Sequence, residues 1–145
     1  MGKKRIIKKG EEGAGGANIG VKQALVSASK RVLEGRVYIF SSYNNILMSL
    51  CDTSGNVLAQ ISAGAIGFKG TKKSTPFAAS KVADALAQAA RNRGMEKVEI
   101  FIKGVGSGRD SALRQLGSKG FEVSSIQDIT PVPHNGPRPR KVRRV

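Results

Sequence analysis

Hydrophobic side chains form two short runs near the middle of the chain, residues 37–40 and 46–51. Runs of this kind, rich in β-branched and aromatic residues, are typical of strands. Tyr43, Asn44 and Asn45 separate them and predict a hairpin turn, since asparagine tolerates a positive φ. A second turn over 52–56 leads to a third run at 57–62. The pattern therefore predicts three consecutive antiparallel strands.

A longer stretch, residues 74–94, has the spacing of an amphipathic helix. Thr75 can cap this helix, Pro76 suits its first position, and Gly94 can end it. The apolar stripe that we expect to face the core consists of Ala78, Val82, Ala85, Leu86 and Ala89.

The remaining pattern predicts a strand at 98–103, a short helix at 110–116 and a last strand at 121–129. The order is βββαβαβ. Because helical crossovers join parallel strands, the later strands are expected to be parallel and the sheet to be mixed. We therefore expect an α/β fold, a mixed sheet of about five strands covered by two helices, in one domain over residues 30–130.

Charge changes this picture at both ends of the chain. The net charge is +15, and residues 131–145 carry five cations and no acid. Such basic segments usually bind nucleic acid and order only when they do. We interpret residues 1–29 as a basic, Gly-rich extension that is disordered when free, although apolar spacing within 22–35 also allows a short helix. Residues 131–145, with four of the five prolines, form an extended Pro/Arg-rich arm.

Composition argues against several other classes of protein. No run of 18 apolar residues exists, and no apolar run follows the basic N-terminus, so we expect neither a membrane span nor secretion. Cys51 is the single cysteine and is expected to be buried and inert. The one histidine, His134, lies in the basic arm, and the carboxylates show no paired spacing. We predict no enzymatic activity, no cofactor and no metal.

Two glycine-rich segments are candidate phosphate sites. Residues 64–76 contain three glycines, three lysines and Phe68, and they end at a helix N-terminus, which favours an anion. Residues 103–111 run from a strand through Gly104, Gly106 and Gly108 into a helix. We expect Gly106 to supply positive φ or close approach to a phosphate. This segment also resembles a dinucleotide-binding turn, but the third glycine of that motif is missing.

Five longer motifs carry a family resemblance: SSYNN at 41–45, DTSGNVL at 52–58, GFKGTKKSTPFAA at 67–79, KGVGSGRDSALRQL at 103–116 and DITPVPHNGPRPRKVRRV at 128–145. Over residues 30–145 the chain resembles the universal small-subunit ribosomal protein eleven family, of bacterial type. The resemblance implies a three-layered α/β fold of ribonuclease H-like topology without its catalytic acids. It also implies a cytoplasmic protein in the ribosome, bound to small-subunit rRNA on the platform, near the mRNA exit and the Shine–Dalgarno cleft. Proteins seven, eighteen and twenty-one would be neighbours.

Charge, glycine pattern and resemblance together select the residues expected to contact RNA. They are Asn44, Asn45, Phe68, Lys69, Lys72, Lys73, Ser74, Thr75, Gly104, Gly106, Gly108, Arg109, His134, Asn135, Arg138, Arg140, Lys141, Arg143 and Arg144. Two alternatives stay open at this point: a non-ribosomal module that binds RNA or single-stranded nucleic acid, and a nucleotide-dependent enzyme.

Overall fold

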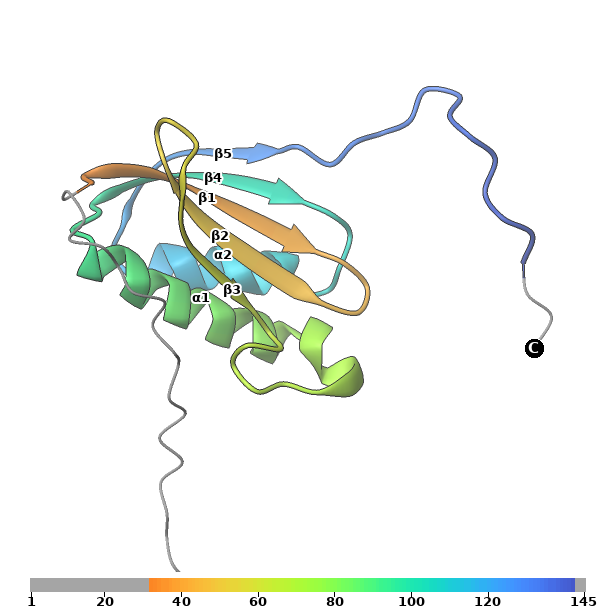
Figure 1. The fold of residues 1–145 in the computed structure, drawn as a ribbon, viewed down its shortest axis with the longest axis horizontal. Coiled ribbons are helices and arrows are strands. Elements are labelled where there is room, and N and C mark those ends of the chain that lie inside the picture. The colour runs from red at the N-terminus through yellow and green to blue at the C-terminus, as the bar shows by residue number, and fades with distance from the viewer. Residues whose placement is uncertain (1–31, 143–145) are drawn as a thin grey trace, which may run out of the picture.

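A mixed five-stranded sheet forms the centre of the fold (Figure 1). The structure is a computed structural model that describes residues 32–142. The strands are β1 (Glu34–Ser41), β2 (Ile46–Asp52), β3 (Val57–Ser62), β4 (Lys97–Lys103) and β5 (Glu122–Asp128), in the spatial order β3-β2-β1-β4-β5. β2 is antiparallel to β1 and β3, whereas β4 is parallel to β1 and β5. The predicted α/β class, strand count and ribonuclease H-like topology are confirmed.

Two α-helices cover one face of the sheet (Figure 1). α1 (Pro76–Asn92) packs against β2, β3 and α2, and α2 (Arg109–Ser118) also contacts β1. The connections β3–α1–β4 and β4–α2–β5 cross the sheet in the same direction, so right-handed crossovers place both helices on the same side. The described residues therefore form two layers, the sheet and the helices. The structure of these residues does not contain the third layer that the family resemblance implied.

Alternation along the strands places the core between sheet and helices. In β1 the side chains of Val37 and Ile39 are buried, and in β4 those of Ile100 and Ile102. The residues between them face the opposite side of the sheet and are partly or fully exposed. Cys51 is also buried, as predicted, and this burial raises the pKa of its thiol.

The boundaries of α1 follow the predicted signals. The Thr75 hydroxyl accepts a hydrogen bond from the amide of Ala78 at 3.3 Å, and Pro76 is the first helical residue. Gly94 follows the helix with φ of 76°. A short 3₁₀ helix, η1 (Gly70–Ser74), which the sequence did not predict, precedes the cap.

The apolar stripe of α1 differs in part from the expected one. Ala85 and Ala89 are only half-buried, whereas Ala83, Ala87 and Ala90 are fully buried. The physical reason is that α1 has two packing partners, since it contacts α2 as well as the sheet. Its buried surface is therefore wider than one stripe and is rotated toward α2.

Several sequence-based predictions lie outside the described residues. They concern the extension over residues 1–29, nearly all of the possible helix within 22–35, and the RNA contacts of Arg143 and Arg144. Within residues 32–142, no helix is long and apolar enough to cross a membrane.

Candidate nucleic-acid interface

Four segments that are far apart in the sequence meet at one end of the sheet (Figure 1). The parallel strands β1, β4 and β5 all end there, so the turn at 42–45, the glycine turn at 104–108 and the arm from residue 129 onward all start there. Loop 64–75 reaches the same end before α1. The strand topology thus gathers most of the sequence-predicted contact residues.

Hydrogen bonds join these segments to one another. The Ser107 hydroxyl donates to the carbonyl of Ser74 at 2.8 Å, which links the glycine turn to loop 64–75. The amide of Gly106 donates to the carbonyl of Ser41 at 3.1 Å. The amide of Gly104 donates to the hydroxyl of Thr130 at 3.1 Å. The glycine turn is therefore hydrogen-bonded to loop 64–75, to the end of β1 before the turn at 42–45, and to the base of the arm.

The glycines of this turn serve close packing within the protein. Gly104 has φ of +103°, and a Cβ built on it would lie 2.1 Å from the carbonyl oxygen of Ser41. Gly106 does not have the expected positive φ; a Cβ there would lie 2.3 Å from the Ser42 carbonyl oxygen. The role expected for Gly106 through positive φ is therefore wrong. The turn at 42–45 already occupies the space beside this glycine, which also argues against a dinucleotide there.

Gly108 is the residue before α2 and has no side-chain cap. A Cβ on it would lie 2.8 Å from the Cβ of Ala79, so this glycine allows α2 to begin close against α1. Contact of Gly104, Gly106 and Gly108 with RNA remains a prediction, but packing alone accounts for all three glycines.

Arg109 fastens the base of the arm. Its guanidinium donates to the carbonyl of Gly104 at 3.0 Å and forms an ion pair with Asp128. Asp128 also accepts hydrogen bonds from the amide of Thr130 at 2.9 Å and from its hydroxyl at 2.6 Å. The bonds from Thr130, followed by the one from Arg109, lower the pKa of Asp128 to about 2. Arg109 is thus engaged within the protein, and its predicted RNA contact would have to use its remaining donors.

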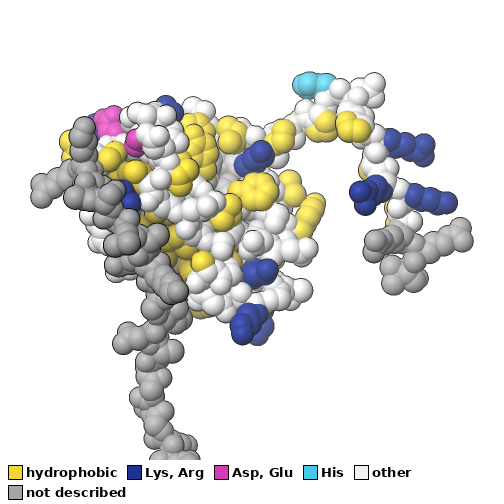
Figure 2. All heavy atoms as spheres, in the orientation of Figure 1, with side chains coloured by type: hydrophobic (Ala, Val, Ile, Leu, Met, Phe, Trp, Pro, Cys, Tyr) yellow, Lys and Arg dark blue, Asp and Glu magenta, His cyan; other side chains and the backbone are white. Residues whose placement is uncertain are grey.

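Loop 64–75 presents a different surface. Lys69 and Lys72 are exposed and Lys73 is half-buried. None of the three has an ion-pair partner among the described residues. Two lysines lie in the last turn of η1, just before the N-terminus of α1, and the first turn of α1 contains no acid. Figure 2 shows dark-blue side chains over this region. Cationic side chains and the positive end of the α1 dipole therefore lie close together.

Two aromatic residues accompany the lysines of this loop. Phe68 is half-buried against the core and packs edge-on against Phe77, with ring centroids 6.0 Å apart. Phe77 is 63% exposed, and the ammonium group of Lys81 lies 5.6 Å from the centre of its ring. Sequence reasoning missed Phe77. Phe77 lies off the apolar stripe of α1 and next to its N-terminal cap, and this position could have predicted an exposed aromatic side chain.

The turn at 42–45 is closed by Ser42 rather than by asparagines with positive φ. The Ser42 hydroxyl accepts from the amide of Asn45 and donates to its carbonyl, both at 3.1 Å. The side chain of Asn44 is exposed. The side-chain carbonyl oxygen of Asn45 is buried and has no hydrogen-bond partner within the described part of the chain.

The arm leaves this end of the sheet as an extended, exposed segment. Residues 131–142 have no regular secondary structure and are exposed throughout. His134, Arg138, Arg140 and Lys141 lie here, and Figure 2 shows cations along it. Asn135 has φ of 52°, the only positive value of a residue other than glycine between residues 32 and 142. The proline-rich arm expected from the sequence is therefore seen as far as residue 142.

Comparison with known proteins shows that the sequence of this chain matches one family. The family model for ribosomal protein S11 matches residues 35–144. The curated small ribosomal subunit protein uS11 of Treponema pallidum, strain Nichols, is 53% identical over 116 residues, covering 80% of this chain and 92% of the relative. The protein of the same name from a second strain of Treponema pallidum has the same identity and coverage. The match includes the sheet, both helices and the basic arm, and the chain belongs to the ribosomal protein S11 family.

Proposed function

We propose that the chain is a non-enzymatic, structural component of the small ribosomal subunit that binds rRNA on the platform, near the mRNA exit and the Shine–Dalgarno cleft. The setting is the bacterial cytoplasm. Proteins seven, eighteen and twenty-one are its proposed neighbours. Family membership supports the ribosomal role, and the resemblance of the motifs supports the finer location.

The observation that carries the RNA-binding role is the convergence of unpaired cations at one end of the sheet. Lys69, Lys72 and Lys73 lie on loop 64–75 at this end, and the arm that starts there carries further cations away from the body (Figure 2); none of the described ones has an acidic partner in the described residues. Phosphate contacts of this kind supply most of the affinity of a protein for RNA and fix its orientation.

The body and the arm have complementary tasks in this proposal. The hydrogen bonds of the glycine turn at 104–108 hold loop 64–75 and the base of the arm at fixed positions. The arm then threads between RNA segments, where arginine can bind phosphate with its planar fork and stack on exposed bases.

Cysteine and histidine side chains often perform catalysis, and this chain contains a single residue of each type. Cys51 is buried, and His134 is exposed on the arm. Within residues 32–142, no group of three His, Cys, Asp or Glu side chains could hold a metal ion. The burial of Cys51 and the exposure of His134 support a structural role.

Chemical footprinting on reconstituted small-subunit rRNA tests the proposed location. We expect the full chain to protect nucleotides of the platform, and the protein to stay with the small subunit through a high-salt wash. Protection confined to another region would contradict the location. Release from the subunit in the wash would contradict a structural role.

A further inference from the structure

The face of the sheet that the helices leave open carries a patch of aromatic side chains. β1 and β4 pair so that Tyr38 lies beside Phe101 and Phe40 beside Lys103. On the other side of β1, Phe40 pairs with Leu47 of β2. Alternation places all of these side chains opposite the core. We call Tyr38, Phe40, Leu47 and Phe101 the aromatic patch.

The two stacked rings of the patch cover one face of each other, so each presents its other face and its edge to a ligand. Tyr38 and Phe101 stack on each other, with ring centroids 5.0 Å apart and planes inclined by 15°. Phe40 is 44% exposed, although it lies in the middle strand of the sheet. No helix of the described residues lies on this face, whereas the opposite face carries both helices (Figure 1). The turn between β2 and β3 approaches the open face only at the end distant from the arm, where Thr53 lines a hollow with Arg36 and Glu99.

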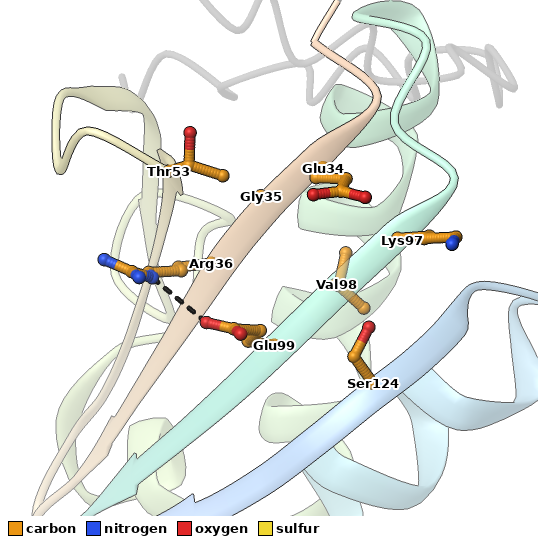
Figure 3. Close-up of a pocket in the computed structure, with 8 residues that line it drawn as sticks. All are labelled: Glu34, Gly35, Arg36, Thr53, Lys97, Val98, Glu99 and Ser124. Carbon is orange, nitrogen blue, oxygen red and sulfur yellow. Dashed lines mark hydrogen bonds and ion pairs between the residues drawn. The ribbon is translucent and has the colours of Figure 1, made fainter.

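Charge differs between the two ends of this open face. At the end distant from the arm, Arg36 pairs with Glu99 at 3.0 Å and Lys97 approaches Glu122 at 3.9 Å. Figure 3 shows the Arg36–Glu99 pair bridging β1 and β4 beside a hollow of about 150 Å³. Around the aromatic patch, the residues paired across the strands are not acidic, and Glu99, two positions before Phe101 on the same face, is paired with Arg36. Lys103 is exposed without an ion-pair partner in residues 32–142.

The aromatic patch also borders the candidate interface directly. Phe40 is followed by Ser41 and the turn at 42–45, and Lys103 is followed by the glycine turn. Figure 2 shows hydrophobic side chains on the visible face extending up to the base of the arm. A strand of RNA held by the basic segments at this end would therefore pass over the rings.

We propose that the aromatic patch is a stacking platform for unpaired bases of RNA, with Lys103 contacting the adjoining phosphate. The partner is RNA, as in the proposed function, on which this assignment rests. Unpaired bases stack on aromatic side chains irrespective of sequence, and each stack contributes substantially to affinity. The pairing of Glu99 with Arg36 and the exposed Lys103, which has no ion-pair partner among the described residues, favour a polyanion over an acidic protein surface.

Tyrosine fluorescence gives a direct test, because the chain has two tyrosines and no tryptophan. Tyr43→Phe leaves Tyr38 as the sole tyrosine. This variant is titrated with a short single-stranded oligoadenylate and with an abasic oligonucleotide of the same length and charge. We expect oligoadenylate to quench Tyr38 and the abasic strand to leave its fluorescence unchanged. Equal signals from the two strands would overturn the proposal.

Substitution of Phe40 supplies a second readout. Phe40→Leu keeps apolar cover on the sheet but removes the ring, and we expect it to reduce affinity for oligoadenylate about tenfold while affinity for the abasic strand stays the same. Val57→Ala is the matched control, since Val57 is 62% exposed on the edge strand β3, away from the patch. Thermal melting confirms that each variant is folded.

The outcomes separate this proposal from the proposed function. Unchanged oligoadenylate affinity in Phe40→Leu, with platform footprints intact, would overturn the stacking platform alone. Loss of a neighbouring ribosomal protein from the reconstituted subunit, with RNA binding unchanged, would identify the patch as a protein-docking surface and likewise overturn it. Loss of the platform footprint in the parent protein would contradict the proposed function instead.

Discussion

Loop 64–75 and the glycine turn at 104–108 look alike in sequence but differ in the structure. Both are rich in glycine and lead into a helix; the loop contains three lysines, and Lys103 and Arg109 flank the turn. In the loop, a Cβ on Gly67 or Gly70 would meet nothing within 4 Å, and the lysines have no acidic partners among the described residues. In the turn, the glycines lie against neighbouring backbone and Arg109 is bonded to Asp128. The same composition therefore serves an outward surface in one place and internal packing in the other.

The strongest test of this contrast is Gly104→Ala. The added Cβ would lie 2.1 Å from the Ser41 carbonyl oxygen at a φ of +103°, so backbone must shift. We expect the free energy of unfolding to fall by about 3 kcal/mol, measured by urea denaturation. Gly117→Ala in α2 is the control; its Cβ meets open space, and it should raise stability by roughly 0.5 kcal/mol. Equal effects of the two changes would contradict the packing role of Gly104.

Deletion of residues 134–145 tests whether the arm, like loop 64–75, contributes to RNA affinity but not to the stability of the fold. It removes five cations but no residue of the core. Thermal stability should hardly change, and affinity for platform RNA should fall about 100-fold at low salt. Loss of about four phosphate contacts should flatten the slope of log affinity against log salt by about 3. Identical slopes for full-length and truncated protein in a salt titration would show that the arm does not contact phosphate.

A smaller effect is expected when Lys69, Lys72 and Lys73 are changed together to alanine. RNA affinity should fall about tenfold, with a salt slope reduced by about 2, because three cations are removed. The melting temperature should stay within a few degrees, since these side chains have no ion pairs in residues 32–142. A large drop in melting temperature without a change in affinity would reverse the contrast between loop and turn.

The smallest effect concerns pH and the base of the arm. The pKa of Asp128 is lowered to about 2 by Thr130 and Arg109. Ionised Asp128 therefore stabilises the fold above about pH 4, where the carboxyl of the unfolded chain is ionised, and this contribution disappears as pH falls toward 2. Melting of the parent and of Asp128→Asn across this range should show the larger loss for the parent. Parallel curves would mean that the Arg109–Asp128 contact does not stabilise the fold.

Local patterns in the sequence were sufficient for most elements of the fold. The strands β1 and β4 follow from short apolar runs, and α1 follows from its Thr75 cap, its Pro76 start and the Gly94 that ends it. The direction in which α1 faces was not predictable in full, because the burial of Ala83, Ala87 and Ala90 depends on α2, which lies elsewhere in the chain.

The candidate site shows the same limit more clearly. Exposed lysines and the arm could be predicted, since charge and proline act through composition. The role of Gly106 could not, because it depends on the backbone of Ser42, more than 60 positions away. The internal bond between Arg109 and Asp128 depends in the same way on the pairing of β5 with β4. RNA contact by these residues stays a prediction.

The fixation of Thr130 has a consequence for how the arm reaches its target. The Thr130 hydroxyl is held by Asp128 and by the amide of Gly104, so the arm begins from a fixed point on the body. The twelve residues 131–142 extend at most roughly 40 Å from that point. Once the lysines of loop 64–75 are bound to RNA, the arm's arginines search only this small volume, at an effective local concentration on the order of millimolar. The second contact then forms as an intramolecular step, and dissociation requires the release of both.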